Sequence, residues 1–179
     1  MKRWFLPLAA VVALAAYAPT AVRPVHRAPA ALDDATIVAI FDAANTADIE
    51  TGDLAAKMGH DKRVRALGAQ FAHDHATVRQ QGRDLAKKLG VTPTPPAGDK
   101  SAADQAAVMK LLRSKKGAEF DKAYLQHEVE FHAAVIDAVT KTLLPAIQNA
   151  ELKAFVERVA PAFQGHMIAA QQLQKDLGY

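Results

Sequence analysis

Apolar residues recur at the three- and four-residue spacing of an α-helix along four long segments of the chain. These segments cover residues 34–59, 62–89, 117–144 and 150–177. Asp33 or Asp34 can cap the first helix and Asp61 the second, while Gly59 and Gly90 are typical helix stops. The pattern predicts an all-α fold in which each long helix buries one face.

The connections between these helices differ in length. Gly59 and Asp61 leave room only for a tight turn, so the first two helices should form an antiparallel hairpin. Residues 90–116 are a much longer connection that begins with the proline-rich stretch VTPTPPAGD. A short amphipathic helix is expected over 102–115. The sequence therefore predicts a four-helix bundle with a long connection, carrying a short extra helix, between its second and third helices.

Two prolines fall within the last two long helices. Pro145 should end or kink the third helix, because proline lacks the N–H that a helix interior needs. Pro161 should kink the fourth helix for the same reason. Neither proline changes the number of helices that we expect.

The first 18 residues follow a different pattern. Lys2 and Arg3 precede an apolar run of 15 residues, which is too short to span a bilayer comfortably and ends in small side chains. This arrangement predicts a secretory signal peptide over residues 1–18 and therefore export of the protein to the periplasm. Cleavage after Ala15 or after Ala18 and retention as an uncleaved anchor all remain open.

The rest of the chain divides into two parts. Residues 19–32 are expected to be a disordered spacer, and 33–179 the bundle domain. After removal of the signal peptide we expect no stable membrane span.

Composition narrows the chemistry. The chain has no cysteine, which excludes disulfides and thiolate metal sites. Its formal net charge is +3, but without Lys2 and Arg3 of the leader the 22 basic side chains become 20, against 19 acidic ones. This near balance gives no electrostatic case for binding nucleic acid. An envelope protein is the candidate partner, and the sequence does not indicate an oligomeric state.

Three histidines lie on the apolar faces of three different helices, close to the middle of each. A helix of about 28 residues is about 42 Å long. His75, His132 and His166 each lie within about three residues, or about 5 Å, of their helix midpoints. Because a midpoint has the same height whichever way the chain runs, we expect the three imidazoles to meet at one level of the bundle.

Carboxylates accompany these histidines. Asp48 lies near the middle of the first helix, Asp74 precedes His75, and Glu128 lies one turn before His132. Buried polar groups must bond one another, water or a metal ion. We therefore predict a site for one transition metal ion, Zn, Cu or Fe, with the ligands His75, His132 and His166, completed by Asp48 or Glu128.

Other polar side chains on these helices are expected to have supporting roles. Asp74 and Glu128 can each act as an acceptor that fixes a histidine tautomer. Asp121 and Tyr124 are expected to be a structural hydrogen-bonding set. The remaining bundle histidines, His60, His73 and His127, should be solvated. Met58, Met109 and Met167 should serve for packing.

The chain resembles the family called domain of unknown function 4142. The resemblance covers about residues 33–177 and rests on ADIETGDLAAK, AQFAHDHATVRQQGRDLAKKLGV, GAEFDKAYLQHEVEFH and PAFQGH. It implies an exported, ferritin-like four-helix bundle and no settled activity. Asp48 stands where this family prefers Glu, and Phe131 replaces an acidic residue often found before the third-helix histidine.

Ferritin-like bundles often hold two metals with a Glu-x-x-His motif on each of two helices. Here Glu128 and His132 are four residues apart, which argues against a di-iron oxidase or an iron-storage protein. The familiar hydrolase, nucleotide and HExxH motifs do not occur either. The sequence thus favours a non-catalytic, exported metal-binding bundle in envelope metal or stress handling. A structural or interaction module, whose polar layer only fixes helix register, is the alternative, and an oxidative enzyme is a third possibility.

Overall fold

The computed structural model describes residues 32–179, which form seven helical segments. They are α1 (Asp34–Met58), α2 (Lys62–Leu89), α3 (Ser101–Arg113), α4 (Ala118–Ala138), the π-helical turn η1 (Val139–Leu143), α5 (Leu144–Ala146) and α6 (Ala150–Leu177). Among the described residues, no helix is long and apolar enough to cross a membrane. The predicted signal peptide and nearly all of the predicted spacer lie outside this range and stay predictions.

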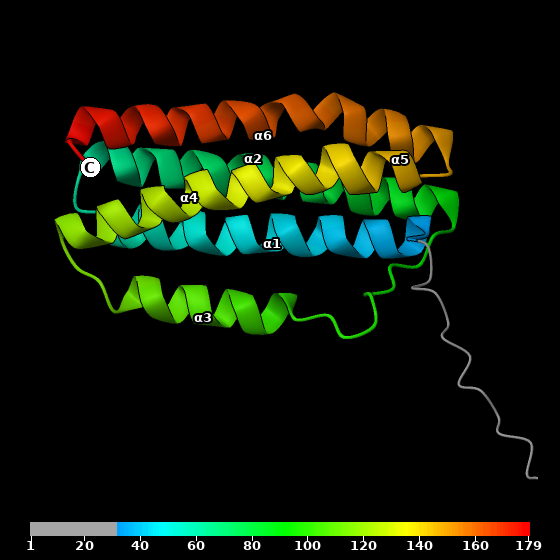
Figure 1. The fold of residues 1–179 in the computed structure, drawn as a ribbon, viewed down its shortest axis with the longest axis horizontal. Coiled ribbons are helices and arrows are strands. Elements are labelled where there is room, and N and C mark those ends of the chain that lie inside the picture. Colours follow the sequence, from blue (N-terminus) through cyan, green and yellow to red (C-terminus); the bar gives the residue numbers. More distant parts are fainter. Residues whose placement is uncertain (1–31) are drawn as a thin grey trace, which may run out of the picture. The chain divides into compact units, whose positions relative to one another are not determined.

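The four long helices form the predicted bundle. α1 and α2 make one antiparallel hairpin, and α4 and α6 make another (Figure 1). The long connection returns the chain along the bundle, so α2 and α4 run in the same direction. α3, within that connection, packs on α1 and α4 outside the four helices (Figure 1). The all-α fold with one long connection and a short extra helix is thereby confirmed.

The α1–α2 hairpin is close because two glycines face each other. A Cβ atom on Gly52 would lie 2.6 Å from the carbonyl oxygen of Gly68. A Cβ atom on Gly68 would lie 2.7 Å from the side chain of Ala55. Only glycine lets the two backbones approach this far, which fixes the axial register of the two helices.

The bundle interior is divided into three zones along its length. One apolar cluster near the α1 N-terminus contains Ile37, Phe41, Val139, Phe155 and Phe163, among others. A second cluster at the opposite end contains Ala55, Val64, Phe120, Leu125 and Leu173, among others. Between them lies a layer of buried polar side chains: Asn45, Asp48, Thr51, His75, Glu128, His132 and His166. The buried face of each long helix is therefore apolar towards both ends and polar near its middle.

The third long helix ends differently from the sequence prediction. We expected one helix to about Leu144, but α4 stops at Ala138 and a π-helical turn and α5 follow. The N–H of Leu144 bonds to the Val139 carbonyl, five residues back. Pro145 has no N–H to continue the α-helical pattern, and the wider turn accommodates it. In contrast, α6 continues through Pro161 as one helix.

Candidate metal centre

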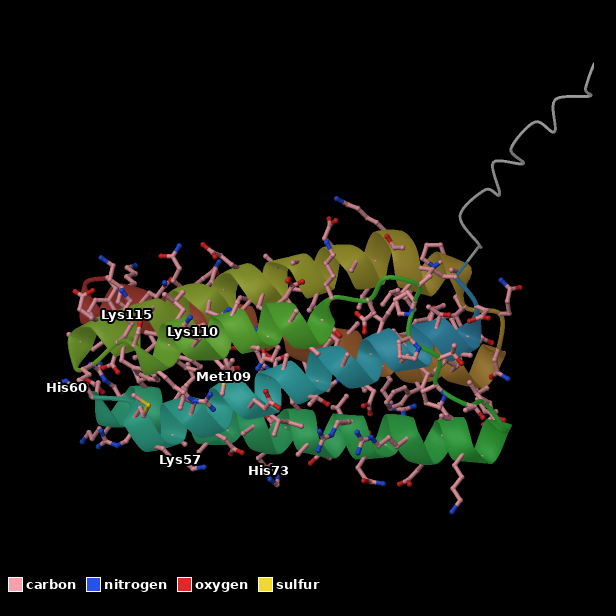
Figure 2. All side chains as sticks on the ribbon, turned by 90° about the horizontal axis from the view of Figure 1, so that it is seen from below. Lys57, His60, His73, Met109, Lys110 and Lys115 are labelled. Carbon is pink, nitrogen blue, oxygen red and sulfur yellow. The ribbon has the colours of Figure 1, made fainter. Side chains whose placement is uncertain are left out.

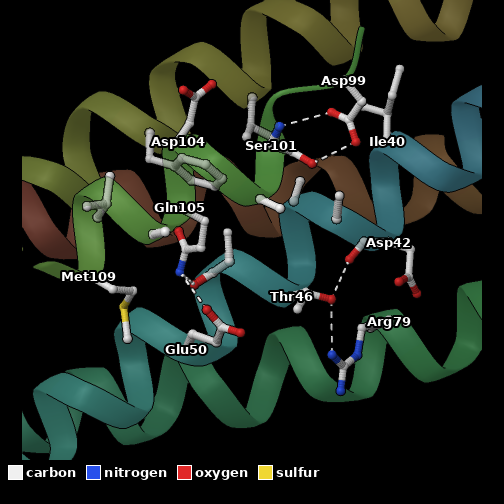
Figure 3. A pocket seen from close by; sticks show the side chains of 18 of the residues that line it. Ile40, Asp42, Thr46, Glu50, Arg79, Asp99, Ser101, Asp104, Gln105 and Met109 are labelled. Atoms are coloured by element: carbon white, nitrogen blue, oxygen red, sulfur yellow. Dashed lines mark hydrogen bonds between the residues drawn. The ribbon is translucent and has the colours of Figure 1, made fainter. Parts of the chain in front are cut away.

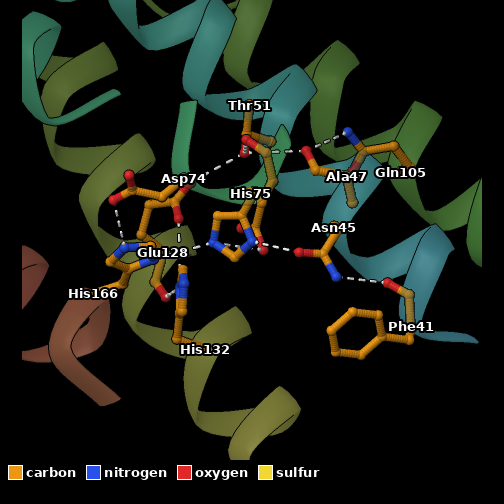
Figure 4. Close-up of polar contacts among 11 residues, drawn as sticks. Phe41, Asn45, Ala47, Thr51, Asp74, His75, Gln105, Glu128, His132 and His166 are labelled. Carbon is orange, nitrogen blue, oxygen red and sulfur yellow. Dashed lines mark hydrogen bonds and ion pairs between the residues drawn. The ribbon is translucent and has the colours of Figure 1, made fainter. Parts of the chain in front are cut away.

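Three imidazole rings from three helices meet in the polar layer. The ring centroids of His75 and His166 are 5.0 Å apart, those of His132 and His166 are 5.4 Å apart, and those of His75 and His132 are 5.5 Å apart. Each residue offers a ring nitrogen within 4.8 Å of the others. The predicted convergence of the three histidines is therefore present (Figure 4).

Each of these histidines uses one ring nitrogen to donate a hydrogen bond away from the centre. His75 Nδ1 lies 3.0 Å from Asn45 Oδ1, and Asn45 is oriented by its amide, which donates to the Phe41 carbonyl at 2.8 Å. His132 Nδ1 lies 2.9 Å from the Glu128 backbone carbonyl. His166 Nε2 lies 3.2 Å from Asp74 Oδ2. All three partners are acceptors, so these nitrogens carry the protons.

The other nitrogen of each ring is then unprotonated and directed inward. Among the described residues, His132 Nε2 has no hydrogen-bond partner. His75 Nε2 and His166 Nδ1 are 3.1 Å apart, with a lone pair on each. Two lone pairs at this distance repel each other unless a proton or a cation lies between them. Nitrogen ligands on one tetrahedral zinc ion are about 3.3 Å apart, given Zn–N bonds of about 2.0 Å.

A proton between His75 Nε2 and His166 Nδ1 is unfavourable. Burial, followed by the neighbouring rings of His166 and His132, lowers the pKa of His75 to about 3. Burial likewise lowers the pKa of His132 to about 4, and it also lowers the pKa of His166. At neutral pH the three rings are uncharged and present lone pairs, which is the form that binds a metal ion.

Two buried carboxyl groups border the same centre. Asp48 Oδ2 lies 3.4 Å from His75 Nε2. Glu128 Oε2 lies 3.5 Å from His132 Nδ1, and its Oε1 accepts a hydrogen bond from Thr51 at 3.1 Å. One oxygen of each carboxyl, Asp48 Oδ1 and Glu128 Oε2, has no hydrogen-bond partner within residues 32–179. Asp48, Glu128 and His132 also form a group whose ligand atoms lie within 4.8 Å of one another.

Burial dominates the electrostatics of these carboxyl groups. It raises the pKa of Glu128 to about 8, and it raises the pKa of Asp48 well above its ordinary value, with the charge of Glu128 adding to the effect. Burial also raises the pKa of Tyr124, followed by the charges of Glu128 and Asp48. The raised pKa values therefore favour the protonated form of both carboxyl groups at neutral pH.

The remaining predicted residues lie in different surroundings. Asp74 is outside the layer but bonds His166, as expected of a residue that fixes a tautomer. Asp121 is buried away from the centre and accepts hydrogen bonds from the backbone N–H groups of His60 and Asp61. Tyr124 is buried, but its hydroxyl has no hydrogen-bond partner in the described part of the chain. The contacts of Asp121 are those of a structural residue, whereas the expected hydrogen-bonding set with Tyr124 does not form.

The histidines predicted to be solvated divide into two groups. His60 and His73 are exposed and lie on the outside of the bundle (Figure 2). His127 is half-buried, with its ring 5.5 Å from that of Phe131. A neighbouring aromatic ring thus covers part of His127, which the helical pattern alone does not reveal.

Sequence reasoning missed two residues of the layer, Asn45 and Thr51, as functional side chains. Asn45 is buried beside His75, and Thr51 bonds Glu128. A signal was present: both lie three residues from Asp48 on the buried stripe of α1. A polar residue on that stripe, one turn from a buried carboxylate, is expected to belong to the same network.

The donor set suits a transition metal ion. Three neutral imidazoles with a carboxylate match the ligands that Zn, Cu and Fe accept in proteins. The outward acceptors are an amide oxygen, a backbone carbonyl and a carboxylate, which are the usual partners of metal-bound histidines. The unpartnered, fully buried atoms of Asp48, Glu128 and His132 would gain a partner from such an ion.

Comparisons with known proteins agree with the fold. A family model described as "Domain of unknown function (DUF4142)" matches residues 20–173. A solved structure described as "CopM in the Cu(II)-bound form" superposes with a TM-score of 0.62 at 10% sequence identity, covering 81% of this chain and 98% of that chain. At this identity the likeness shows the fold alone. Comparison with curated proteins gives no match.

Proposed function

Since the chain belongs to the family called domain of unknown function 4142, which carries no activity in its description, we propose a function from the site itself. The protein binds one transition metal ion at mid-height of the bundle. His75, His132 and His166 are the ligands, and Asp48 or Glu128 completes the set. Asp74 and Asn45 orient two of the histidines.

One observation carries this proposal: three neutral imidazoles direct unprotonated nitrogens at a common centre while their outer nitrogens are held by acceptors. A layer that served only to fix helix register would pair these atoms with one another. Instead, a buried histidine nitrogen and two buried carboxyl oxygens have no hydrogen-bond partner among residues 32–179. Leaving such groups unpartnered costs about 1–3 kcal/mol each.

Copper is the first ion to test. Imidazole suits Cu(II), which ranks highest among divalent first-row metals for a given nitrogen and oxygen site. The structural neighbour described as Cu(II)-bound supports the same choice. Zinc and iron fit the donor set as well. With the predicted signal peptide, the proposed role is metal or stress handling in the cell envelope.

The decisive measurement is metal content and affinity of protein purified without a histidine tag. We expect stoichiometric metal in the native protein and calorimetric binding of one Cu(II) or Zn(II) tighter than about 1 μM. Replacing the three histidines together (H75Q, H132Q and H166Q) should weaken binding by at least about 100-fold. The exposed-histidine variant H73Q is the matched control and should bind as the parent does. Parent protein with affinity no tighter than the triple variant would refute the proposal.

The alternative function, a structural or interaction module, makes a different prediction for the same triple variant. If the layer only sets helix register, the variant would lose thermal stability with or without metal, and added Cu(II) would not stabilise the parent. A bound ion stabilises the folded state in proportion to the logarithm of its concentration. Melting curves of parent and variant at several Cu(II) concentrations therefore separate the two functions.

A further inference from the structure

Exposure to solvent falls steeply from one side of the polar layer to its centre. The side chain of Asp74 is 39% exposed and that of its partner His166 is 10% exposed. The side chains of His75 and His132 are 2% and 1% exposed. His166 is therefore the layer residue closest to water, and Figure 4 shows it joined to Asp74 at the edge of the layer.

A second route to the layer begins in a groove with charged side chains and continues through an apolar passage. A groove of about 1130 Å³ lies between α3 and the α1–α4 face, with Gln105 of α3 bonded to Glu50 across it (Figure 3). A cavity of about 50 Å³ beside His75 shares four lining residues with this groove: Ile40, Ala44, Val135 and Ala138. A charged ion would have to lose its hydration among these apolar side chains, which is costly. On the other side, the Asp74 carboxylate lies 3.2 Å from His166 of the layer, so an ion bound there need not cross an apolar passage.

The helix that carries His166 has two weak points in the turns before that residue. Pro161 has no N–H to donate to the Glu157 carbonyl, so one helical hydrogen bond is missing. Gly165 lies one turn further along the helix, and a Cβ atom there would meet nothing within 4 Å. Packing thus does not require this glycine, unlike Gly52 and Gly68. A glycine in a helix interior makes local opening easier, because it gains the most backbone freedom.

We propose that Asp74 and His166 form a gate through which the metal ion reaches the centre. A hydrated cation binds first to the exposed Asp74 carboxylate. The weakened segment from Glu157 to Gly165 then lets His166 turn outward, take the ion and carry it to the inward nitrogens of His75 and His132. This inference rests on the proposed function and adds the path and order of binding.

Stopped-flow kinetics with Cu(II) on the full chain tests the gate, with quenching of tyrosine and tryptophan emission as the signal. D74N keeps an oxygen that can accept the His166 Nε2–H bond but removes the charge. We expect its association rate constant to fall at least about tenfold and to lose most of its dependence on ionic strength. A residue that only orients His166 would change the dissociation rate instead. D84N, an exposed aspartate of the same helix, is the control and should associate as the parent does.

Two further variants separate the routes. G165A should lower the association and dissociation rate constants together, leaving the dissociation constant within about twofold, because only the barrier changes. A138V narrows the passage between the groove and the small cavity and should leave both rates unchanged. The gate is refuted if the parent binds Cu(II) and D74N and G165A associate at the parental rate, or if A138V alone slows association. A parent that binds neither Cu(II) nor Zn(II) refutes the proposed function and the gate with it.

Discussion

At the scale of single residues, the hydrogen bond of Asn45 determines which ring nitrogen of His75 carries the proton. The amide of Asn45 is held by the Phe41 carbonyl, so its oxygen faces His75 Nδ1 and fixes the proton there. Nε2 is then free to be a ligand. Without this acceptor, His75 could place its proton on Nε2 and lose its ability to bind an ion.

Replacing Asn45 therefore tests the histidine tautomer. N45L removes the acceptor and should weaken Cu(II) binding by about 10- to 100-fold, as loss of such a partner does in other metal sites. N45D keeps an acceptor oxygen and should retain most of the affinity. Competitive titration of both variants against a chelator of known affinity gives the comparison. Equal affinity of N45L and the parent would mean that Asn45 does not set the tautomer.

The sequence was sufficient to find the histidines because helical periodicity and midpoint position are both local properties. It was not sufficient for Asn45 and Thr51, since an amide or a hydroxyl on a helix carries no metal signature of its own. Asp121 was grouped with Tyr124 because the two are neighbours on one helix face. Its actual partners are the N–H groups of His60 and Asp61, about 60 residues away, and only the tertiary fold brings them together.

At the scale of elements, the close approach of α1 and α2 is the most demanding packing in the bundle. It places Asn45 and Asp48 of α1 next to His75 of α2, so the layer depends on the register that Gly52 and Gly68 set. Any larger side chain at these glycines must push the two backbones apart.

A pair of glycine variants measures this effect. G68A places a methyl group 2.7 Å from the Ala55 side chain and should destabilise the protein by about 1–3 kcal/mol. G165A adds the same methyl group in open space and should stabilise by up to about 1 kcal/mol, because alanine favours the helix more than glycine. Urea denaturation of both variants and the parent gives the two free energies. A G68A variant as stable as G165A would contradict the tight crossing.

The elements themselves were largely predictable. The predicted bounds of the second and fourth helices, 62–89 and 150–177, agree with α2 and α6, because capping residues mark their ends. The π-helical turn before Pro145 was not predictable. Proline indicates a break in the α-helical pattern. Whether the helix ends, bends or widens there depends on what the nearby side chains of Val139 and Leu143 pack against.

At the scale of the whole molecule, the two hairpins hold each other at both ends. Asp121 of α4 accepts the backbone N–H groups of the α1–α2 turn at 2.7 and 2.8 Å. Asp34 of α1 accepts those of Gln148 and Asn149 before α6 at 2.8 and 2.9 Å. The polar layer joins the hairpins at the middle, so its protonation state should influence the stability of the entire bundle.

The metal-free protein should therefore be most stable near about pH 6. The pKa values of His75 and His132 are lowered from the ordinary value of 6.5 to about 3 and about 4 in the folded chain. Below pH 6.5 the unfolded chain therefore binds protons at these two histidines that the folded chain does not bind. Stability then falls with falling pH. The pKa of Glu128, raised from 4.5 to about 8, means that the folded chain keeps a proton that the unfolded one has lost. Stability then falls as pH rises towards 8.

Denaturation of chelator-treated protein at pH values from about 4 to about 8.5 tests this profile. E128Q should flatten the alkaline limb, because it removes the Glu128 carboxyl and the charge that acts on Asp48. Replacing the exposed His73 should leave the acid limb unchanged. A profile of the parent that rises steadily from pH 6 to pH 8 would contradict the protonated carboxyl pair.

The long connection between α2 and α4 has one more consequence. Residues 92–95 and 97–100 are exposed. They do not take part in the contacts of Asp121, of Asp34 or of the polar layer, which join the two hairpins. A protease that cuts there would leave two fragments, one with Asp48 and His75 and the other with Glu128, His132 and His166. The fragments would stay associated as a two-chain complex, and a chelator that withdraws a shared ion would then promote their dissociation.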